Sequence, residues 1–176
     1  RADELGLDMM VSSTTALHAP AFPGSIDLMG HGCSPGLSAY DRATGIRKLT
    51  DPDTRPEDYA RPGHIFPLRA KKGGVLRRTG HTEAAIDLAR LAGFSPAGVL
   101  VEILNTDGTM ARMPQLYEIS RKHNLKIITI KDLVEFRMRN ERLVKREFEV
   151  NMDTEYGAFR VVAFQQITTG DIHLAI

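Results

Sequence analysis

An alternation of helical and strand patterns through the middle of the chain is what most constrains its fold. Apolar residues recur at helical spacing in three segments and form continuous apolar runs in two others. In chain order these are helix 82–91, strand 97–104, helix 114–123, strand 126–130 and helix 131–143. Helices that alternate with strands must pack on a sheet to bury their apolar faces. The chain is therefore predicted to form a layered α/β or α+β domain.

The part that precedes this alternation is rich in turn-forming residues. From Asp8 to Asp53, glycines and prolines interrupt any long element, which favours loops and short strands. One helix is predicted there, over residues 37–49, because Ser38 is a suitable N-cap and Arg47 and Lys48 lie at its basic end.

The end of the chain has a strand pattern only. Residues 147–152, 158–164 and 172–176 read as three strands joined by turns. We therefore expect three parts, listed here with their boundaries: an α+β domain over 1–138, a linker over 139–146, and a short β-rich extension over 147–176 that the chain cuts short.

Composition narrows the class of protein. Lys and Arg number 23 against 22 Asp and Glu, and the resulting net charge of +1 does not favour nucleic acid as a partner. No apolar run approaches the roughly 20 residues of a membrane span, so no membrane partner is expected. The single cysteine, Cys33, cannot form an internal disulfide, which fits a cytoplasmic protein. The chain starts at Arg1 without an initiator methionine, and we expect residues upstream of it.

Two histidines follow glycines in turn-rich segments. His64 ends the run Arg61-Pro-Gly-His, and His81 follows Arg78-Thr-Gly. A glycine before each ring allows the ring to project from a loop into a site. The alternatives are a structural His64 bonded to backbone and a surface His81 that forms ordinary hydrogen bonds.

The second histidine segment also has the components of a phosphate site. Thr82 is placed to cap a helix that begins at Glu83, and Arg78 lies just before it. A guanidinium, a hydroxyl and a helix N-terminus together favour anion binding. The alternative is an ordinary capped helix with a solvated arginine.

Glu102 lies inside the apolar run of residues 97–104. A buried carboxylate must be paired, protonated or bound to a cation, which favours a functional role. Alternatively, Glu102 lies at the wet edge of the strand or pairs with Arg112. The residues that follow, 105–112, are predicted to form a tight turn around Gly108, of the kind that often lines a ligand site.

Longer runs of residues resemble a known family. Residues 61–70, 73–84, 87–93 and 107–112, together with Glu102, closely resemble 3,4-dihydroxy-2-butanone 4-phosphate synthase of riboflavin biosynthesis, over residues 1–138. The tail, with residues 154–160 and 170–175, resembles the first strands of a GTP cyclohydrolase II domain, as in bifunctional riboflavin enzymes.

The resemblance implies an α+β fold, a layered α/β sandwich of the synthase type. It also implies a lyase that converts ribulose 5-phosphate into formate and 3,4-dihydroxy-2-butanone 4-phosphate, with Mg²⁺ or Mn²⁺, as a homodimer. It implies catalytic roles for His64 and Glu102 and a metal-ligand role for His81. The substrate-binding residues that it implies are Arg78, Thr79, Gly80, His81, Thr82 and Glu102.

Departures from the family pattern leave a second hypothesis open. Pro35 and the strand expected before Asp27, which Pro23 and Gly24 interrupt, favour it. The acidic loop that supplies carboxylate metal ligands is expected upstream of Arg1. Pro35 replaces a phosphate-contacting threonine, and Gly45 replaces another threonine. The alternative function is that of a catalytically degenerate homologue, acting as a dimerisation scaffold or a sugar-phosphate binding module for a downstream cyclohydrolase domain.

Overall fold

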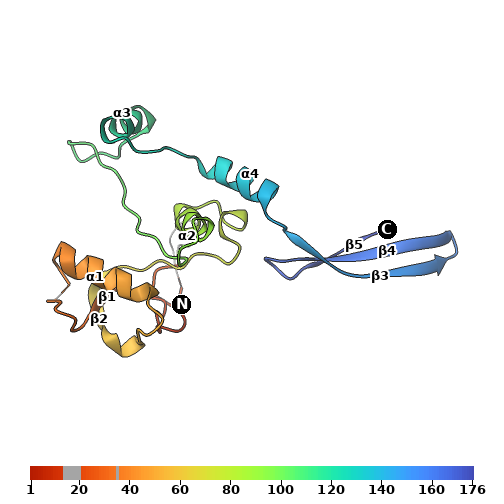
Figure 1. Cartoon of the computed structure of the whole chain (residues 1–176), viewed down its shortest axis with the longest axis horizontal. Coiled ribbons are helices and arrows are strands. Elements are labelled where there is room, and N and C mark those ends of the chain that lie inside the picture. Colours follow the sequence, from red (N-terminus) through yellow and green to blue (C-terminus); the bar gives the residue numbers. More distant parts are fainter. Residues whose placement is uncertain (14–20, 35) are drawn as a thin grey trace. The chain divides into compact units, whose positions relative to one another are not determined.

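The computed structural model describes residues 1–13, 21–34 and 36–176, which form two compact units. One unit comprises Arg1–Ala70 and Ala85–Val99, and the other comprises Lys71–Ala84 and Leu100–Ile176. Figure 1 labels the helices and strands along the chain. In order they are β1 (Ile26–Leu28), α1 (Ala39–Thr50), β2 (Tyr59–Ile65), α2 (His81–Leu91), α3 (Met113–His123), α4 (Ile130–Asn140), β3 (Val144–Thr154), β4 (Gly157–Gln166) and β5 (Ile172–Ala175), with short 3-10 helices η1 (Pro56–Asp58) and η2 (Gly74–Leu76).

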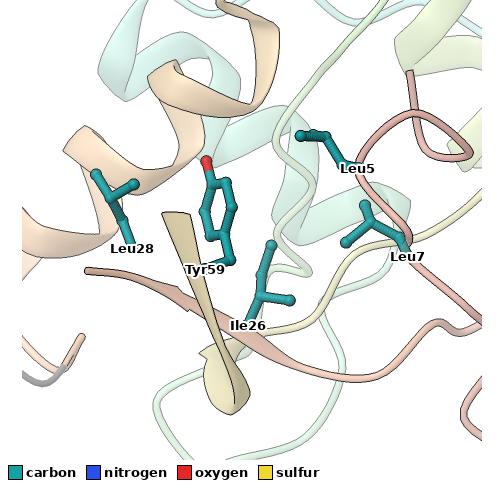
Figure 2. Close-up of a cluster of buried hydrophobic side chains, with 5 residues drawn as sticks. All are labelled: Leu5, Leu7, Ile26, Leu28 and Tyr59. Carbon is teal, nitrogen blue, oxygen red and sulfur yellow. The ribbon is translucent and has the colours of Figure 1, made fainter. Parts of the chain in front are cut away.

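The first unit has its core around the antiparallel pair β1 and β2. Figure 2 shows the buried side chains of this core, which are Leu5, Leu7, Ile26, Leu28 and Tyr59. The Tyr59 hydroxyl donates a hydrogen bond of 2.7 Å to the Gly45 carbonyl, which ties the sheet to α1. Gly45 is buried and lies close to Ile65 and Leu28. A Cβ at this position would lie 3.2 Å from Ile65 Cδ1. The missing side chain therefore lets α1 pack closely on the sheet.

Helix α1 confirms the predicted helix with its cap. The Ser38 hydroxyl accepts a hydrogen bond of 3.0 Å from the Asp41 backbone N–H, which satisfies one of the free donors of the first turn. Arg47 and Lys48 lie in the last turn, where a positive charge is favourable. The helix occupies Ala39–Thr50, close to the predicted range of 37–49.

The second unit is built around a smaller buried cluster. Val75 of η2, Ala84 of α2 and Leu133 of α4 pack together. The buried Arg137 side chain of α4 donates a hydrogen bond of 2.7 Å to the Gly73 carbonyl. Through this bond, helix α4 holds the loop that precedes α2.

The end of the chain forms a three-stranded antiparallel sheet in the order β3-β4-β5. This confirms the three strands predicted there, with β3 and β4 longer than expected. Helix α4 ends at Asn140 and β3 begins at Val144, within the predicted linker segment 139–146. The three-part division 1–138, 139–146 and 147–176 stays a prediction.

Two predicted strands do not form. Within residues 97–104, only Leu104 makes a β-bridge, to Met110, and residues 126–130 contain no strand. Val99 and Val101 are 70% and 86% exposed, so the predicted burial of this run is wrong. An apolar run becomes a strand only when another strand edge pairs with it, and no described residues pair with this one beyond that bridge. The remaining mixture of helices and sheets confirms the α+β class.

The described helices also bear on membrane association. None of the helices in residues 1–13, 21–34 and 36–176 is long and apolar enough to cross a membrane.

Candidate active site

His64 is held by a buried aspartate of the neighbouring strand. The His64 Nδ1 atom lies 2.6 Å from Asp27 Oδ2, and the His64 backbone N–H donates a 2.9 Å hydrogen bond to Asp27 Oδ1. The Asp27 side chain is 10% exposed, whereas the His64 side chain is 43% exposed. A carboxylate only accepts hydrogen bonds, so this contact favours the proton on Nδ1 of the ring.

The register of β1 and β2 explains how His64 reaches this position. Asp27 pairs with Ala60, yet the adjacent Ile26 pairs with Ile65, so residues 61–64 are extra residues in β2. A bulge of this kind redirects side chains and is common beside active sites. His64 therefore lies in an irregular strand and not in a loop, which corrects the prediction.

Gly63 allows the two strands to approach at the bulge. A Cβ on Gly63 would overlap the backbone of Ile26 and Asp27, and the Gly63 N–H donates a 3.1 Å hydrogen bond to the Ser25 hydroxyl. The glycine before His64 thus serves close packing of strands and not a flexible turn. The close approach of the two strands at Gly63 places His64 beside Asp27.

The second histidine segment is organised by Glu83. This side chain is 1% exposed, and its Oε2 accepts a 2.6 Å hydrogen bond from Arg78 Nη1. Its Oε1 accepts a 2.9 Å hydrogen bond from the Lys71 backbone N–H. The Arg78 side chain is 31% exposed, so the guanidinium is held at one corner while part of it faces solvent. Its remaining N–H groups can reach an anion.

Helix α2 begins at His81 and not at Glu83. Thr82 therefore lies within the first turn, and the prediction that it caps the helix is wrong. The reason is Gly80, whose carbonyl accepts the first helical bond, of 3.0 Å, from the Ala84 N–H. The N-terminus of α2 still presents free backbone donors, and His81 is exposed beside them. Thr79 is also exposed and Thr82 is half-buried.

Glu102 is not in the environment that was expected for it. It is exposed, within a segment that forms no strand. The described residues show no ion pair between Glu102 and Arg112, whose backbone N–H instead donates to Gln115 Oε1. The predicted burial of this carboxylate is wrong, because its strand lacks a partner, and its catalytic role stays a prediction.

The predicted turn after Glu102 is confirmed. The Asn105 N–H donates to the Thr109 carbonyl at 2.7 Å, and Gly108 has a φ of +86°. Asp107 accepts hydrogen bonds from the Thr109 hydroxyl and N–H. These bonds stabilise the carboxylate and lower the pKa of Asp107 below its ordinary value.

A divalent metal does not fit the described residues taken alone. They contain no group of three or more histidine, cysteine, aspartate and glutamate side chains that could hold a metal ion. Mg²⁺ prefers several oxygen ligands, whereas His81 offers one nitrogen. Pro35, the predicted departure at the phosphate site, lies outside the described residues.

Sequence reasoning had not singled out Asp27 or Glu83. Asp27 is flanked by Ile26 and Leu28, and a carboxylate between apolar neighbours in a short strand was the available signal. Glu83 offered only its place in the first turn of a helix.

Comparison with known proteins decides the family. The family model described as 3,4-dihydroxy-2-butanone 4-phosphate synthase matches residues 1–136. The chain belongs to the 3,4-dihydroxy-2-butanone 4-phosphate synthase family. This confirms the resemblance predicted over residues 1–138.

Curated relatives of this synthase family are longer than the chain. It is 61% identical over 176 residues to the riboflavin biosynthesis protein RibBA of Cytophaga hutchinsonii, and 54% identical over 176 residues to RibBA of Porphyromonas gingivalis. Each match covers 100% of this chain and 44% of the relative. The chain thus spans less than half the length of these relatives.

Solved synthase structures share the fold. The chain is similar to RibBX of A. baumannii, described as a two-domain 3,4-dihydroxy-2-butanone 4-phosphate synthase, with a TM-score of 0.85 and 44% identity over 99% of this chain and 51% of that one. A synthase in complex with two magnesium ions matches with a TM-score of 0.70 and 34% identity, over 79% of this chain and 69% of that one.

Proposed function

We propose that this chain supplies the synthase part of a riboflavin-biosynthesis enzyme, which converts ribulose 5-phosphate into formate and 3,4-dihydroxy-2-butanone 4-phosphate. The family match over residues 1–136 is the observation that carries this proposal. The relatives named riboflavin biosynthesis protein support it, as does the synthase fold of the structural neighbours.

In this proposal His64 acts as a base. Enolisation of a ketose removes a proton from the carbon beside the carbonyl, and a neutral imidazole is suited to that step near pH 7. Asp27 holds Nδ1 of the ring through a 2.6 Å contact, which leaves Nε2 for the proton. Glu102 is proposed as the second proton-transfer group.

The substrate phosphate is proposed to bind at the start of α2. Arg78 supplies a guanidinium whose remaining N–H groups suit phosphate oxygens. Thr79, Gly80, His81 and Thr82 surround the helix N-terminus, where backbone donors and the helix dipole favour an anion.

A divalent cation is proposed as the cofactor. The support comes from a similar synthase described in complex with two magnesium ions. Mg²⁺ is proposed, with Mn²⁺ as an alternative, and His81 as one ligand. The described residues form no cluster of three ligands, so in this proposal further oxygen ligands come from outside them.

Two further features of the whole protein are proposed. A second domain of the GTP cyclohydrolase II type, which residues 147–176 would begin, is proposed from the resemblance of the tail. The chain covers only 44% of the relatives named RibBA, which agrees with a further domain in them. A homodimer is proposed from the family resemblance alone.

A second candidate function is a degenerate synthase domain, which would serve as a dimerisation scaffold or bind a sugar phosphate without chemistry. The exposure of Glu102 and the lack of a three-ligand metal cluster among the described residues favour it. Arg78 and the start of α2 would still bind phosphate in that case.

Formate release from ribulose 5-phosphate separates the two functions. The assay uses the full-length protein with added Mg²⁺, and compares the wild type with His64→Ala and Glu102→Gln. The control is His123→Ala, at the exposed end of α3. We expect turnover in the wild type and the control and its loss in both site variants. Binding of the substrate without formate release would instead support the binding module.

A further inference from the structure

The buried carboxylate of Glu83 has no role in the chemistry proposed above. It lies in the first turn of α2 and is 1% exposed. Placing a carboxylate in the interior costs free energy unless its partners compensate, and a well-packed apolar side chain of similar volume often serves stability equally well. Stability alone therefore does not explain why a carboxylate with two hydrogen-bond partners occupies this position.

Both partners of Glu83 belong to the loop that leads into α2. Oε1 accepts from the Lys71 backbone N–H at 2.9 Å, at the start of the loop. Oε2 accepts from Arg78 Nη1 at 2.6 Å, at its end. One carboxylate thus joins the two ends of an eight-residue segment, residues 71–78, to the first turn of the helix.

The rest of that segment is fixed from other sides. The Gly73 carbonyl accepts a 2.7 Å hydrogen bond from Arg137, and Val75 is buried against Ala84 and Leu133. The loop backbone is therefore held by α4 and by the small core. The side chain of Arg78 is the part that Glu83 orients.

Gly80 gives independent support for this arrangement. A Cβ on Gly80 would overlap the Arg78 guanidinium and would lie 2.6 Å from Glu83 Oε2. The ion pair therefore occupies the space that a side chain at position 80 would need. Gly80, just before α2, therefore leaves room for a guanidinium that is held by a carboxylate.

We propose that Glu83 is a positioning residue, which holds the Arg78 guanidinium at the N-terminus of α2 so that its remaining N–H groups face the substrate phosphate. The inference rests on the proposed function, because it assigns the phosphate to Arg78. Binding of Nη1 to Glu83 leaves the other nitrogens of the fork available. The Arg78 side chain therefore loses rotamer freedom when the protein folds and not when the substrate binds.

A double-mutant cycle on the full-length protein tests this role. The variants are Glu83→Gln, Arg78→Ala and the double variant, and the control is Glu118→Gln on the exposed surface of α3. We expect Glu83→Gln to raise KM for ribulose 5-phosphate roughly tenfold, the value of one charged hydrogen bond, with little change in kcat. In the Arg78→Ala background the same change should have almost no further effect on KM, because Glu83 acts through Arg78.

A merely structural Glu83 would behave differently. Its replacement would then lower activity by the same factor with and without Arg78, and that result would overturn the inference. If Glu83→Gln does not fold, Glu83→Met takes its place in the cycle, since it fills the volume without a charge.

The proposed function can fail separately from this inference. An inactive wild type contradicts the synthase activity alone. Calorimetry with inorganic phosphate then applies the same cycle without turnover, and equal loss of phosphate affinity in both backgrounds again overturns the positioning role.

Discussion

At the scale of single residues, two buried carboxylates each hold another side chain. Asp27 contacts both the ring and the backbone N–H of His64, and Glu83 contacts Arg78. Such partners fix a tautomer or a donor direction, so under the proposed function we expect their replacement to reduce activity.

Replacement of Asp27 should expose this dependence. Asp27→Asn removes the carboxylate that keeps the proton on Nδ1 of His64, so Nε2 is no longer held as the base. We expect kcat for formate release to fall about 10- to 100-fold, with a smaller change in KM. The exposed Asp8→Asn serves as the control. An unchanged kcat in Asp27→Asn would remove His64 from its proposed role.

From the raised pKa of Tyr59 we predict how the stability of the first unit depends on pH. Burial raises the pKa of its hydroxyl from 10.0 to about 12. The folded state therefore favours the neutral phenol. The stability that this preference contributes is fully present below pH 10, the pKa of an unfolded tyrosine, and is lost as the pH rises towards 12. Denaturation followed by circular dichroism should show wild-type stability falling across that range.

The variant Tyr59→Phe provides the comparison. It cannot ionise, so its stability should change less between pH 10 and 12. Near pH 7 it should be less stable by about 1 kcal/mol, because the hydrogen bond to the Gly45 carbonyl is lost. Parallel curves for the two proteins above pH 10 would contradict the assignment.

At the scale of elements, local signals determined the helices. The cap of α1 is an example, since Ser38 and Asp41 lie within one turn of each other. The helix bounds predicted for α1 to α4 agree with the structure closely at most ends, whereas α4 ends at Asn140, three residues before the predicted end. Caps and helical spacing involve neighbours in the sequence, so they can be recognised without the fold.

The cap of α1 can be tested directly. Ser38→Ala removes the acceptor of the Asp41 N–H and should lower the free energy of unfolding by about 1 kcal/mol. Ser38→Asp keeps an acceptor at the cap and should retain most of the stability. Urea titration measures both, and equal losses in the two variants would show that the cap bond contributes nothing.

The bulge in β2 gives a test with a matched glycine. Gly63→Ala would place a methyl group against the Ile26 backbone and should cost about 1–3 kcal/mol while displacing His64. Gly24→Ala has open space and should be nearly neutral. The readouts are thermal melting and formate release. A Gly63→Ala protein with normal activity would separate the bulge from the site.

At the scale of the whole molecule, the two units each have their own small core. Neither unit's described residues provide three metal-ligating side chains in one group. Ligands that bind only the folded state raise its melting temperature.

Metal removal therefore has a specific expected outcome for the 176-residue chain. We expect EDTA or added Mg²⁺ to shift its melting temperature by less than about 2 °C, because there is little binding energy to add to the folded state. Differential scanning calorimetry measures this. A shift of several degrees with Mg²⁺, and none with Na⁺ at equal ionic strength, would reveal a metal site that the described residues do not show.

The distance in sequence between interacting residues explains which features could be predicted from the sequence. The helices, the turn around Gly108 and the strands of the tail were predicted because their signals lie within a few residues. The strand at 97–104 and the burial of Glu102 were predicted wrongly, since an apolar run cannot specify whether another strand is available to pair with it.

The sequence alone determined the family, through long matching motifs, and the local structure, through caps, periodicity and turns. The tertiary structure alone decided which carboxylates contact His64 and Arg78. Asp27 lies 37 residues before His64, and the pair meets only because β1 and β2 align with a bulge between them. Glu83 is near Arg78 in sequence, yet its burial depends on the packing of η2 and α4 around the loop. Contacts of this kind follow from strand register and core packing, which no local pattern of residues encodes.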